Sequence, residues 1–206
     1  IMPSLVGSEM CIRDRLRQCA HPGGAAICGA ELLYPDETLQ HAGVVTGLGG
    51  YAGHSHKYKQ KGGSGYLFRT ATVQDFSAVT GACLLVRASV YDEVGGLDEQ
   101  FAVAFNDVDF CLRVRDAGYR IAWTPYAQLV HYESKSRGGD EKDPAKAARF
   151  AAEQQRLYAI HGKEDILDDP YYNPNLTRDR EDFSESDDLR RLKEGTVIVR
   201  FRGGEA

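Results

Sequence analysis

The sequence predicts an α/β fold, in which a mixed sheet is flanked by helices. Residues 78–86 form a predominantly apolar run that is typical of a buried strand. Residues 87–94 and 107–117 have the pattern of helices, and a further apolar segment starts at residue 121. Strands that alternate with helices in this way indicate a sheet covered by helices. The apolar residues, 42% of the chain, are sufficient for a core.

The first half of the chain contains short strands and one long connection. Residues 25–34 read as a strand, and residues 35–38 have the Pro and Asp chemistry of a turn. A second short strand is expected over residues 39–45. Residues 46–65 are rich in Gly, His, Lys and Ser and have no period, so we expect a long mobile loop there.

Two helices and two short strands are expected in the second half. The helix over 107–117 has an apolar stripe at i, i+3 and i+4, and the helix over 144–161 starts with proline. Three side chains of the later helix are expected to face the core: Phe150, Leu157 and Ile160. Residues 121–123 and 128–131 read as two strands, separated because Pro125 ends the first of them.

Composition excludes some classes of protein. The net charge is −5 and the basic residues are scattered, which argues against nucleic-acid binding. No run of about 18 apolar residues is present, so no transmembrane segment is expected. The five cysteines include no CxxC pair. Cys83 and Cys111 lie in apolar patterns and read as small core residues, which suits a reducing cytoplasm.

The chain divides into three parts on pattern alone. Residues 1–15 have no helical or strand period and do not resemble a signal peptide, so we expect a non-native leader. Residues 16–165 are expected to form one domain. Residues 166–206 are rich in proline and charge and are expected to form an extended, partly disordered tail.

The acidic run around Asp107 and Asp109 is the first candidate for an active site, because it stands where a helix begins. Three interpretations remain open on the residues alone. The two acids could cap the helix, could share a metal ion, or could supply a general base, with Asp107 as base and Asp109 as cap. In a helix, side chains at i and i+2 point about 200° apart, which weakens the shared-metal interpretation.

Three histidines also require an interpretation. His54 and His56 could lie on one face of an extended segment and bind a metal, or could be solvated loop residues. His131 follows a short strand, where an isolated histidine is either a surface residue or part of a site.

Several segments together resemble one known family. They are Leu32-Leu33-Tyr34-Pro35-Asp36, Gln40-His41-Ala42-Gly43, residues 80–87, Val94-Gly95-Gly96-Leu97-Asp98, the acidic run, residues 117–120, Val130-His131 and the tail run 169–176. In order and spacing, the stretch from Leu32 to about Leu176 resembles the C-terminal half of family 2 glycosyltransferases of the GT-A fold. Within the family it is most similar to bacterial enzymes of O-antigen and other surface polysaccharides, rhamnosyltransferase-like among them.

The resemblance implies an incomplete GT-A (Rossmann-like) α/β fold that lacks the N-terminal nucleotide-binding half. It implies inverting transfer of a sugar from a nucleotide-diphospho-sugar to a glycan or lipid-linked glycan, with a divalent cation, Mn²⁺ or Mg²⁺. Asp107 would be the catalytic base, and His131 would ligate the metal. The protein would be cytoplasmic, with peripheral contact at the inner face of the membrane.

Further residues acquire roles from the resemblance. Thr80, Gly81, Asn106 and Asp109 would border the acceptor. Asn106 departs from the Glu that many relatives have there. Lys135 and Arg137 would neutralise the donor diphosphate, although a solvated loop is an equal alternative. A non-catalytic glycan-binding or scaffolding module is the rival function, and a half sheet with an open edge that does not fold alone is a third alternative.

Overall fold

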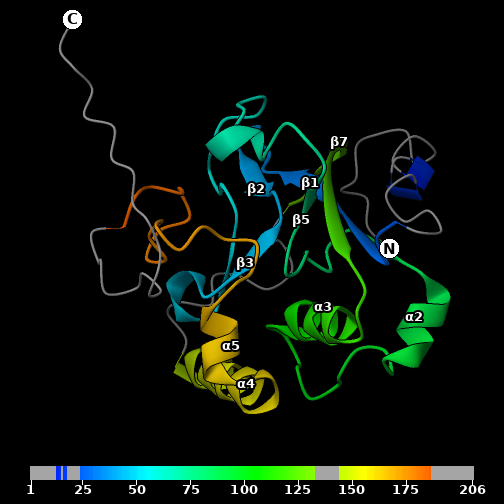
Figure 1. The fold of residues 1–206 in the computed structure, drawn as a ribbon. Coiled ribbons are helices and arrows are strands. Elements are labelled where there is room, and N and C mark those ends of the chain that lie inside the picture. Colours follow the sequence, from blue (N-terminus) through cyan, green and yellow to red (C-terminus); the bar gives the residue numbers. More distant parts are fainter. Residues whose placement is uncertain (1–12, 15, 18–23, 133–143, 187–206) are drawn as a thin grey trace, which may run out of the picture.

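One five-stranded mixed sheet forms the centre of the computed structural model, which describes residues 13–14, 16–17, 24–132 and 144–186 (Figure 1). The strand order is β2-β1-β7-β5, and β6 also pairs with β1. The central strands β1 (Ile27–Leu33) and β7 (Ile121–Val130) are parallel. The three short strands are antiparallel to their neighbours; they are β2 (Leu39–His41), β5 (Gln74–Asp75) and β6 (Leu84–Val86). The predicted α/β class is confirmed.

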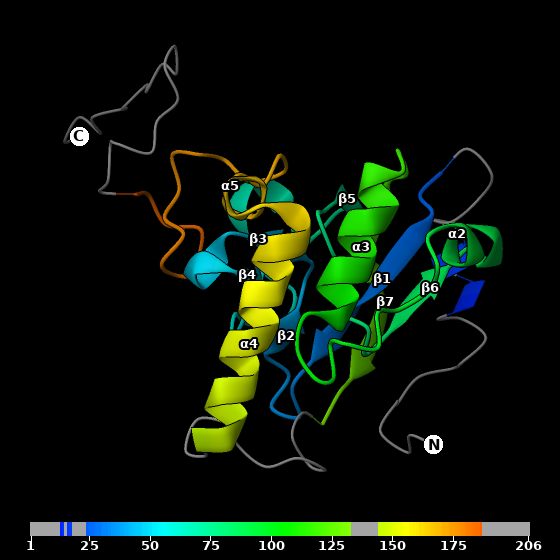
Figure 2. The ribbon, with the colours of Figure 1, turned by 90° about the horizontal axis from the view of Figure 1, so that it is seen from below.

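Helices α3 (Asn106–Asp116) and α4 (Pro144–His161) lie side by side on one face of this sheet (Figure 2). The shorter helices are α2 (Ala88–Glu93) and α5 (Lys163–Leu167). The predicted helices at 87–94, 107–117 and 144–161 are therefore confirmed, the last with unchanged bounds. Within the described ranges, no helix has both the length and the apolar character that crossing a membrane requires.

The core lies between the sheet and these helices. Its largest fully buried side chains include Trp123, Phe110 and Leu157. The prediction for α4 holds only for Leu157, because Phe150 and Ile160 are 38% and 43% exposed. Phe150 nevertheless contacts the rings of Tyr51 and Phe105, so α4 covers the edge of the core rather than its centre.

The expectation of a long mobile loop over residues 46–65 is wrong. Strands β3 (Val44–Thr46) and β4 (Ala52–His54) form a second, two-stranded sheet, joined through the 3₁₀ turn η1 (Leu48–Gly50). Gly47 and Gly50 in this connection have φ values of 83° and 87°, which glycine adopts without steric penalty. The glycine-rich composition reflects a tight turn, not an absence of structure.

Two strand predictions also need correction. In the run 78–86 only Leu84–Val86 is a strand; the buried residues before it bond to other segments, as where the Val44 N–H donates to the carbonyl of Ala78. Pro125 does not end a strand. The partner of β7 changes from Thr124 opposite Ala30 to Gln128 opposite Glu31, so Pro125 lies in a bulge, where the ladder does not need its N–H.

The segment after α5 packs onto the same body. Tyr172, Leu176 and Phe183 are buried, and the Thr177 N–H donates to the carbonyl of Ser184. The described part of the predicted tail, up to residue 186, is thus folded against the core. The predicted leader over residues 1–15 and the end of the tail beyond residue 186 fall almost wholly outside the described residues.

Candidate functional site

Asp107 lies in the first turn of α3 and contacts the loop that precedes β6. The residue before the helix, Phe105, has a left-handed backbone (φ 62°) that turns the chain into α3. The Asp107 carboxylate accepts the Gly81 N–H through Oδ2 at 2.8 Å and the Val108 N–H through Oδ1 at 2.9 Å. The fold thereby brings together two residues, Asp107 and Gly81, that are 26 positions apart.

Gly81 and Asn106 help to define the position of the Asp107 side chain. A Cβ added at Gly81 would lie 3.4 Å from the Asp107 Cβ, so the glycine allows a close approach. On the other side, Asn106 Oδ1 accepts the Asp107 N–H at 2.8 Å. A half-buried carboxylate is thus held between two backbone donors, with lone pairs left on both oxygens.

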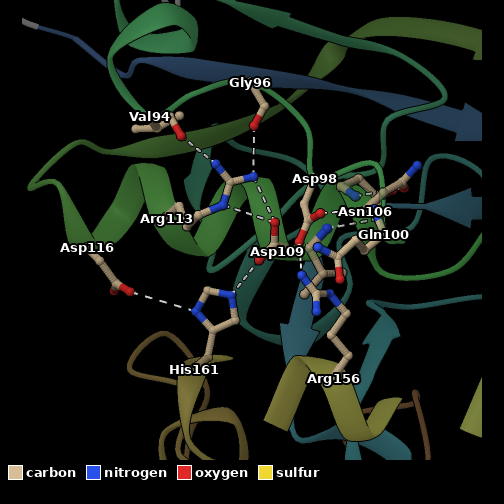
Figure 3. Close-up of polar contacts among 12 residues, drawn as sticks. Val94, Gly96, Asp98, Gln100, Asn106, Asp109, Arg113, Asp116, Arg156 and His161 are labelled. Carbon is tan, nitrogen blue, oxygen red and sulfur yellow. Dashed lines mark hydrogen bonds and ion pairs between the residues drawn. The ribbon is translucent and has the colours of Figure 1, made fainter. Parts of the chain in front are cut away.

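Asp109 occupies a different environment, shown in Figure 3. Its residue is 1% exposed, and Oδ2 accepts hydrogen bonds from Nε and Nη2 of Arg113 at 3.0 and 2.8 Å. His161 Nε2, from the end of α4, donates to Oδ1 at 2.9 Å. Burial alone would raise the pKa of Asp109, but the hydrogen bonds from His161 and Arg113 outweigh it and hold this pKa below its ordinary value.

The predictions for Asp109 need correction for this reason. It does not cap α3, since its oxygens accept hydrogen bonds from the side chains of Arg113 and His161 rather than from a backbone N–H of the first turn. Its carboxylate faces α4 and the Arg113 guanidinium, so the acceptor-bordering role fits it poorly. Asp107 and Asp109 point to different partners, and the geometry excludes a metal ion shared by the two.

Arg113 extends this cluster to the end of α2. Its Nη1 and Nη2 donate to the carbonyls of Val94 and Gly96 at 2.6 and 2.8 Å. Asp109 therefore links α4, α3 and the turn after α2 (Figure 3). This is a structural role, which positions the helix that carries Asp107.

His131 follows directly after β7, where its N–H donates to the carbonyl of Leu33 at 2.9 Å. Gln40 contacts it twice: Gln40 Nε2 donates to the His131 carbonyl at 3.3 Å, and Gln40 Oε1 lies 2.8 Å from His131 Nδ1. Because the amide oxygen can only accept, Nδ1 carries a proton and Nε2 of the neutral ring keeps its lone pair. A metal-binding histidine usually has this arrangement, with its other ring N–H bonded to an oxygen.

A cavity of about 100 Å³ connects His131 to the loop beside Asp107. Its lining includes Gln40, His54, Lys57, Thr80 and His131. Thr80 precedes Gly81, whose N–H holds Asp107. The structure therefore places Thr80, Gly81, Asn106, Asp107 and His131 along one edge of the sheet, at the carboxyl end of β7.

A buried histidine, His41, bonds to the backbone of this edge at Thr80. His41 is fully buried; its Nε2 accepts the Thr80 N–H at 3.4 Å, and its Nδ1 lies 3.1 Å from Nδ1 of His54. Since a peptide N–H can only donate, Nε2 is unprotonated and Nδ1–H donates to His54. Burial, followed by the charge of His54, lowers the pKa of His41 well below its ordinary value, so it stays neutral.

The sequence reasoning assigned no role to Gln40 or His41. One signal was present in the sequence: Gln40 and His41 are adjacent polar residues in a short, otherwise apolar strand. Successive side chains of a strand point to opposite faces of the sheet, so one polar residue lies on each face.

Both interpretations of His54 and His56 are wrong. His56 is 1% exposed; its Nδ1 bonds the Ser55 hydroxyl and its Nε2 accepts the Tyr66 N–H. Burial, with the charges of Arg69 and Lys59, lowers the pKa of His56 to about 4. Its ring stacks on Phe183, while His54 faces His41, so the pair neither binds one metal nor lies in solvent.

The described residues supply only part of a metal-binding site. Within the residues that the structure describes, no group of three or more His, Cys, Asp or Glu side chains could hold a metal ion. His131 supplies one nitrogen in the correct tautomer, and further ligands would have to come from elsewhere. Lys135 and Arg137 lie outside the described residues.

A curled mixed sheet flanked by helices, with a carboxylate at a helix start beside its edge, is consistent with a GT-A-like fold. Residues 7–157 match the profile of the family described as "Glycosyl transferase family group 2", and the chain belongs to this family. The resemblance stated from the sequence is confirmed.

The curated relatives agree with this family. The chain is 49% identical over 161 residues to "Uncharacterized protein y4gI" of Sinorhizobium fredii, covering 78% of this chain and 18% of the relative. It is 36% identical over 165 residues to "O-antigen biosynthesis protein RfbC" of Myxococcus xanthus, covering 80% and 12%. Over 80 residues it is 36% identical to an N-acetylglucosaminyl-diphospho-decaprenol L-rhamnosyltransferase of Mycobacterium tuberculosis, covering 39% and 24%. The chain thus spans less than a quarter of the length of these relatives.

Proposed function

We propose that this chain forms the acceptor side of an inverting glycosyltransferase that builds cell-surface polysaccharide. The donor is a nucleotide-diphospho-sugar, and the acceptor is a glycan or a lipid-linked glycan. The observation that carries the proposal is the Asp107 carboxylate, held by the Gly81 N–H at 2.8 Å beside the cavity that contains His131. Family membership and the names of the relatives support sugar transfer in polysaccharide synthesis.

Asp107 acts as the general base. It takes the proton of an acceptor hydroxyl as the hydroxyl oxygen forms a bond to the anomeric carbon from the side opposite the leaving diphosphate. Attack from that side inverts the anomeric configuration. Each Asp107 oxygen already accepts one backbone N–H, which fixes the carboxylate while a lone pair remains for the substrate. Such proton transfer typically contributes about 10² to 10⁴-fold to the rate.

The other site residues surround this base. Thr80, Gly81 and Asn106 border the acceptor, and Asp109 positions α3 through Arg113 and His161. His131 offers Nε2 to Mn²⁺ or Mg²⁺, which would supply charge stabilisation to the leaving diphosphate. Lys135 and Arg137 remain proposed diphosphate contacts.

We place the reaction in the cytoplasm. A lipid-linked acceptor would bring the protein into peripheral contact with the inner face of the membrane.

The test is Asp107→Asn in a full-length protein that carries this chain. Asparagine keeps the shape and one acceptor oxygen but cannot take the proton. We expect kcat to fall by about 10²-fold or more with an unchanged KM for the donor. The matched control is Asp116→Asn at the exposed end of the same helix, which should keep full activity. A rate near wild type for Asp107→Asn would exclude the base assignment, and glycan binding by a wild type without transfer would favour the glycan-binding alternative.

A further inference from the structure

The motif Asp169–Leu176 has no part in the proposed reaction, yet it is firmly anchored. Asp169 is 2% exposed; its Oδ2 accepts the Thr46 N–H at 2.7 Å, and its Oδ1 accepts the Tyr171 N–H at 2.8 Å. The Asn173 side chain donates to the Tyr66 hydroxyl at 3.0 Å. These contacts fix the aromatic residues of the motif against the segment that contains Arg69.

A pocket of about 600 Å³ lies between the two segments. Its lining includes the aromatic residues Tyr66, Tyr171, Tyr172 and Phe183, the polar or charged residues Arg69, Gln74, Asp75, Arg120 and Asn173, and the apolar residues Leu67, Val73 and Pro170. Arg120, at the rim, immediately precedes β7, whereas His131 follows the far end of that strand. At about 3.3 Å per residue, the strand separates Arg120 from His131 by roughly 30 Å.

Arg69 is the unusual residue of this pocket. Its Nε and Nη2 atoms are buried and have no hydrogen-bond partner, and they account for two of the five such side-chain atoms within the described ranges. Its guanidinium stacks over the ring of Phe76 at 4.7 Å and lies 5.8 Å from the ring of Phe183. By contrast, Arg120 at the rim pairs with Asp75 at 3.0 Å.

Nε and Nη2 together form the side of a guanidinium that binds a carboxylate or phosphate with two parallel hydrogen bonds. Buried donors without partners are rare, because each one costs free energy. Stacking on the Phe76 ring stabilises the charge of Arg69, but it does not provide an acceptor for the two N–H groups. Neither Asp75, which pairs with Arg120, nor Asp169, whose charge acts on Arg69, makes a hydrogen bond to these two donors, so one side of an anion contact is left without an acceptor.

The charged side chains that line the pocket are Arg69, Arg120 and Asp75. Because Asp75 pairs with Arg120, the lining carries a net excess of one positive charge, on Arg69. A local excess of positive charge attracts anions.

We propose that this pocket is a second binding site, which takes an oxyanion carried on a sugar-sized body and holds that oxyanion through Arg69. The ring of Tyr171 offers a face for a sugar ring, and Asn173 and the Tyr66 hydroxyl offer polar contacts at its edge. The ligand class is an acidic sugar, with its negative charge on a carboxylate or a phosphate. The site is separate from the Asp107 edge, so it does not depend on the proposed reaction.

The test uses the 206-residue chain and three probes: glucuronate, glucose and inorganic phosphate, each against sodium chloride at equal ionic strength. The readouts are the ¹⁵N–¹H resonance of the Arg69 Nε–H group and the thermal midpoint of unfolding. Glucuronate should shift the Arg69 resonance saturably and raise the midpoint, and phosphate should do so more weakly. Glucose should give neither effect.

Two variants locate the contacts. Arg69→Gln should weaken glucuronate binding about tenfold or more, since it removes a charge-assisted bidentate contact. Tyr171→Ala should weaken glucuronate but not phosphate, because only the sugar meets the ring. The matched control, Arg180→Gln, changes an exposed arginine outside this pocket and should bind as wild type.

The wild-type titration keeps the proposal falsifiable even if a variant fails to fold. No shift of the Arg69 resonance with glucuronate or phosphate, or an equal shift with sodium chloride, would overturn it. Equal binding of glucose and glucuronate would also overturn it, because Arg69 would then have no role. Equal binding of phosphate and glucuronate, insensitive to Tyr171→Ala, would overturn the sugar part and leave a site for free anions.

Discussion

Replacement of Asp109 by alanine should destabilise the protein strongly, because its buried carboxylate joins α3 to α4. The side chain accepts three hydrogen bonds of 2.8 to 3.0 Å, two from Arg113 and one from His161. Removal leaves the His161 ring, 6% exposed, without this acceptor, and leaves the Arg113 charge without its carboxylate.

The magnitude follows from the burial of the partners. Breaking a buried ion pair by removing one partner costs about 3 to 5 kcal/mol. Arg113 keeps its bonds to the Val94 and Gly96 carbonyls and is 25% exposed, which reduces the loss. We therefore expect the lower end of the range, a decrease of about 3 kcal/mol in the free energy of unfolding.

Urea denaturation, followed by circular dichroism, measures this decrease. Asp92→Asn on α2 is the control, because that carboxylate is exposed; it should change stability by less than about 0.5 kcal/mol. A double-mutant cycle with His161→Ala isolates the coupling across α3 and α4. A loss below about 1 kcal/mol for Asp109→Ala would refute the reasoning, because exposed pairs are worth that much.

The pH dependence of Asp109 adds an independent check. Its pKa is lowered in the folded state, so its contribution is present above the unfolded pKa, about 3.9, and is lost as the pH falls through the folded value. The stability difference between wild type and Asp109→Asn should therefore shrink on acidification below about pH 4. A difference that stays constant down to pH 2 would contradict this.

Three further predictions concern other groups. Burial, only partly offset by a hydrogen bond from Gln128, raises the pKa of Glu31 to about 7, so between about pH 4.3 and 7 the folded state binds a proton that the unfolded state does not. Above about pH 7 the buried carboxylate is charged and destabilises the fold. Glu31→Gln should therefore increase the free energy of unfolding more at about pH 8 than at about pH 5, as measured by urea denaturation at both values. Gly43 has φ +93°, and an added Cβ would lie 2.5 Å from the Phe76 ring. Gly43→Ala should therefore lower the free energy of unfolding by more than about 2 kcal/mol, as measured by thermal denaturation. The same change at Gly63, an exposed glycine without such a contact, is the control and should have little effect. Gln40→Leu removes the oxygen that fixes the tautomer of His131. It should weaken Mn²⁺ binding by a full-length protein about tenfold, as measured by titration calorimetry. An unchanged affinity would exclude His131 as a metal ligand.

The helices could be predicted from the sequence because each has a local signal. The apolar spacing of α3 and the proline that starts α4 determine their positions with no knowledge of the rest of the chain. The sequence indicates Asp107 as a candidate through its place at the start of a helix. Its contact with Gly81 depends on how two distant segments meet.

The errors concern properties that only tertiary contacts decide. The bulge around Pro125 depends on how β7 pairs with β1. Strands β3 and β4, by contrast, pair with each other across the turn at residues 48–50, and the glycine-rich composition of this hairpin hid them. Asp109 was assigned to a cap from its position in the first turn, but a histidine 52 residues away determines its role. No local pattern contains that information.

The turn between β1 and β2 has a consequence for chemistry at some distance from it. Asp36 Oδ1 accepts both the N–H and the hydroxyl of Thr38, and this turn sets the pairing in which Leu32 faces His41. Because neighbours on a strand face opposite sides, a shift of β2 by one residue would exchange Gln40 and His41. The protons on His131 and His54 would then be placed differently. Variation in this exposed turn would therefore change the surroundings of His131 without replacing any residue that contacts it.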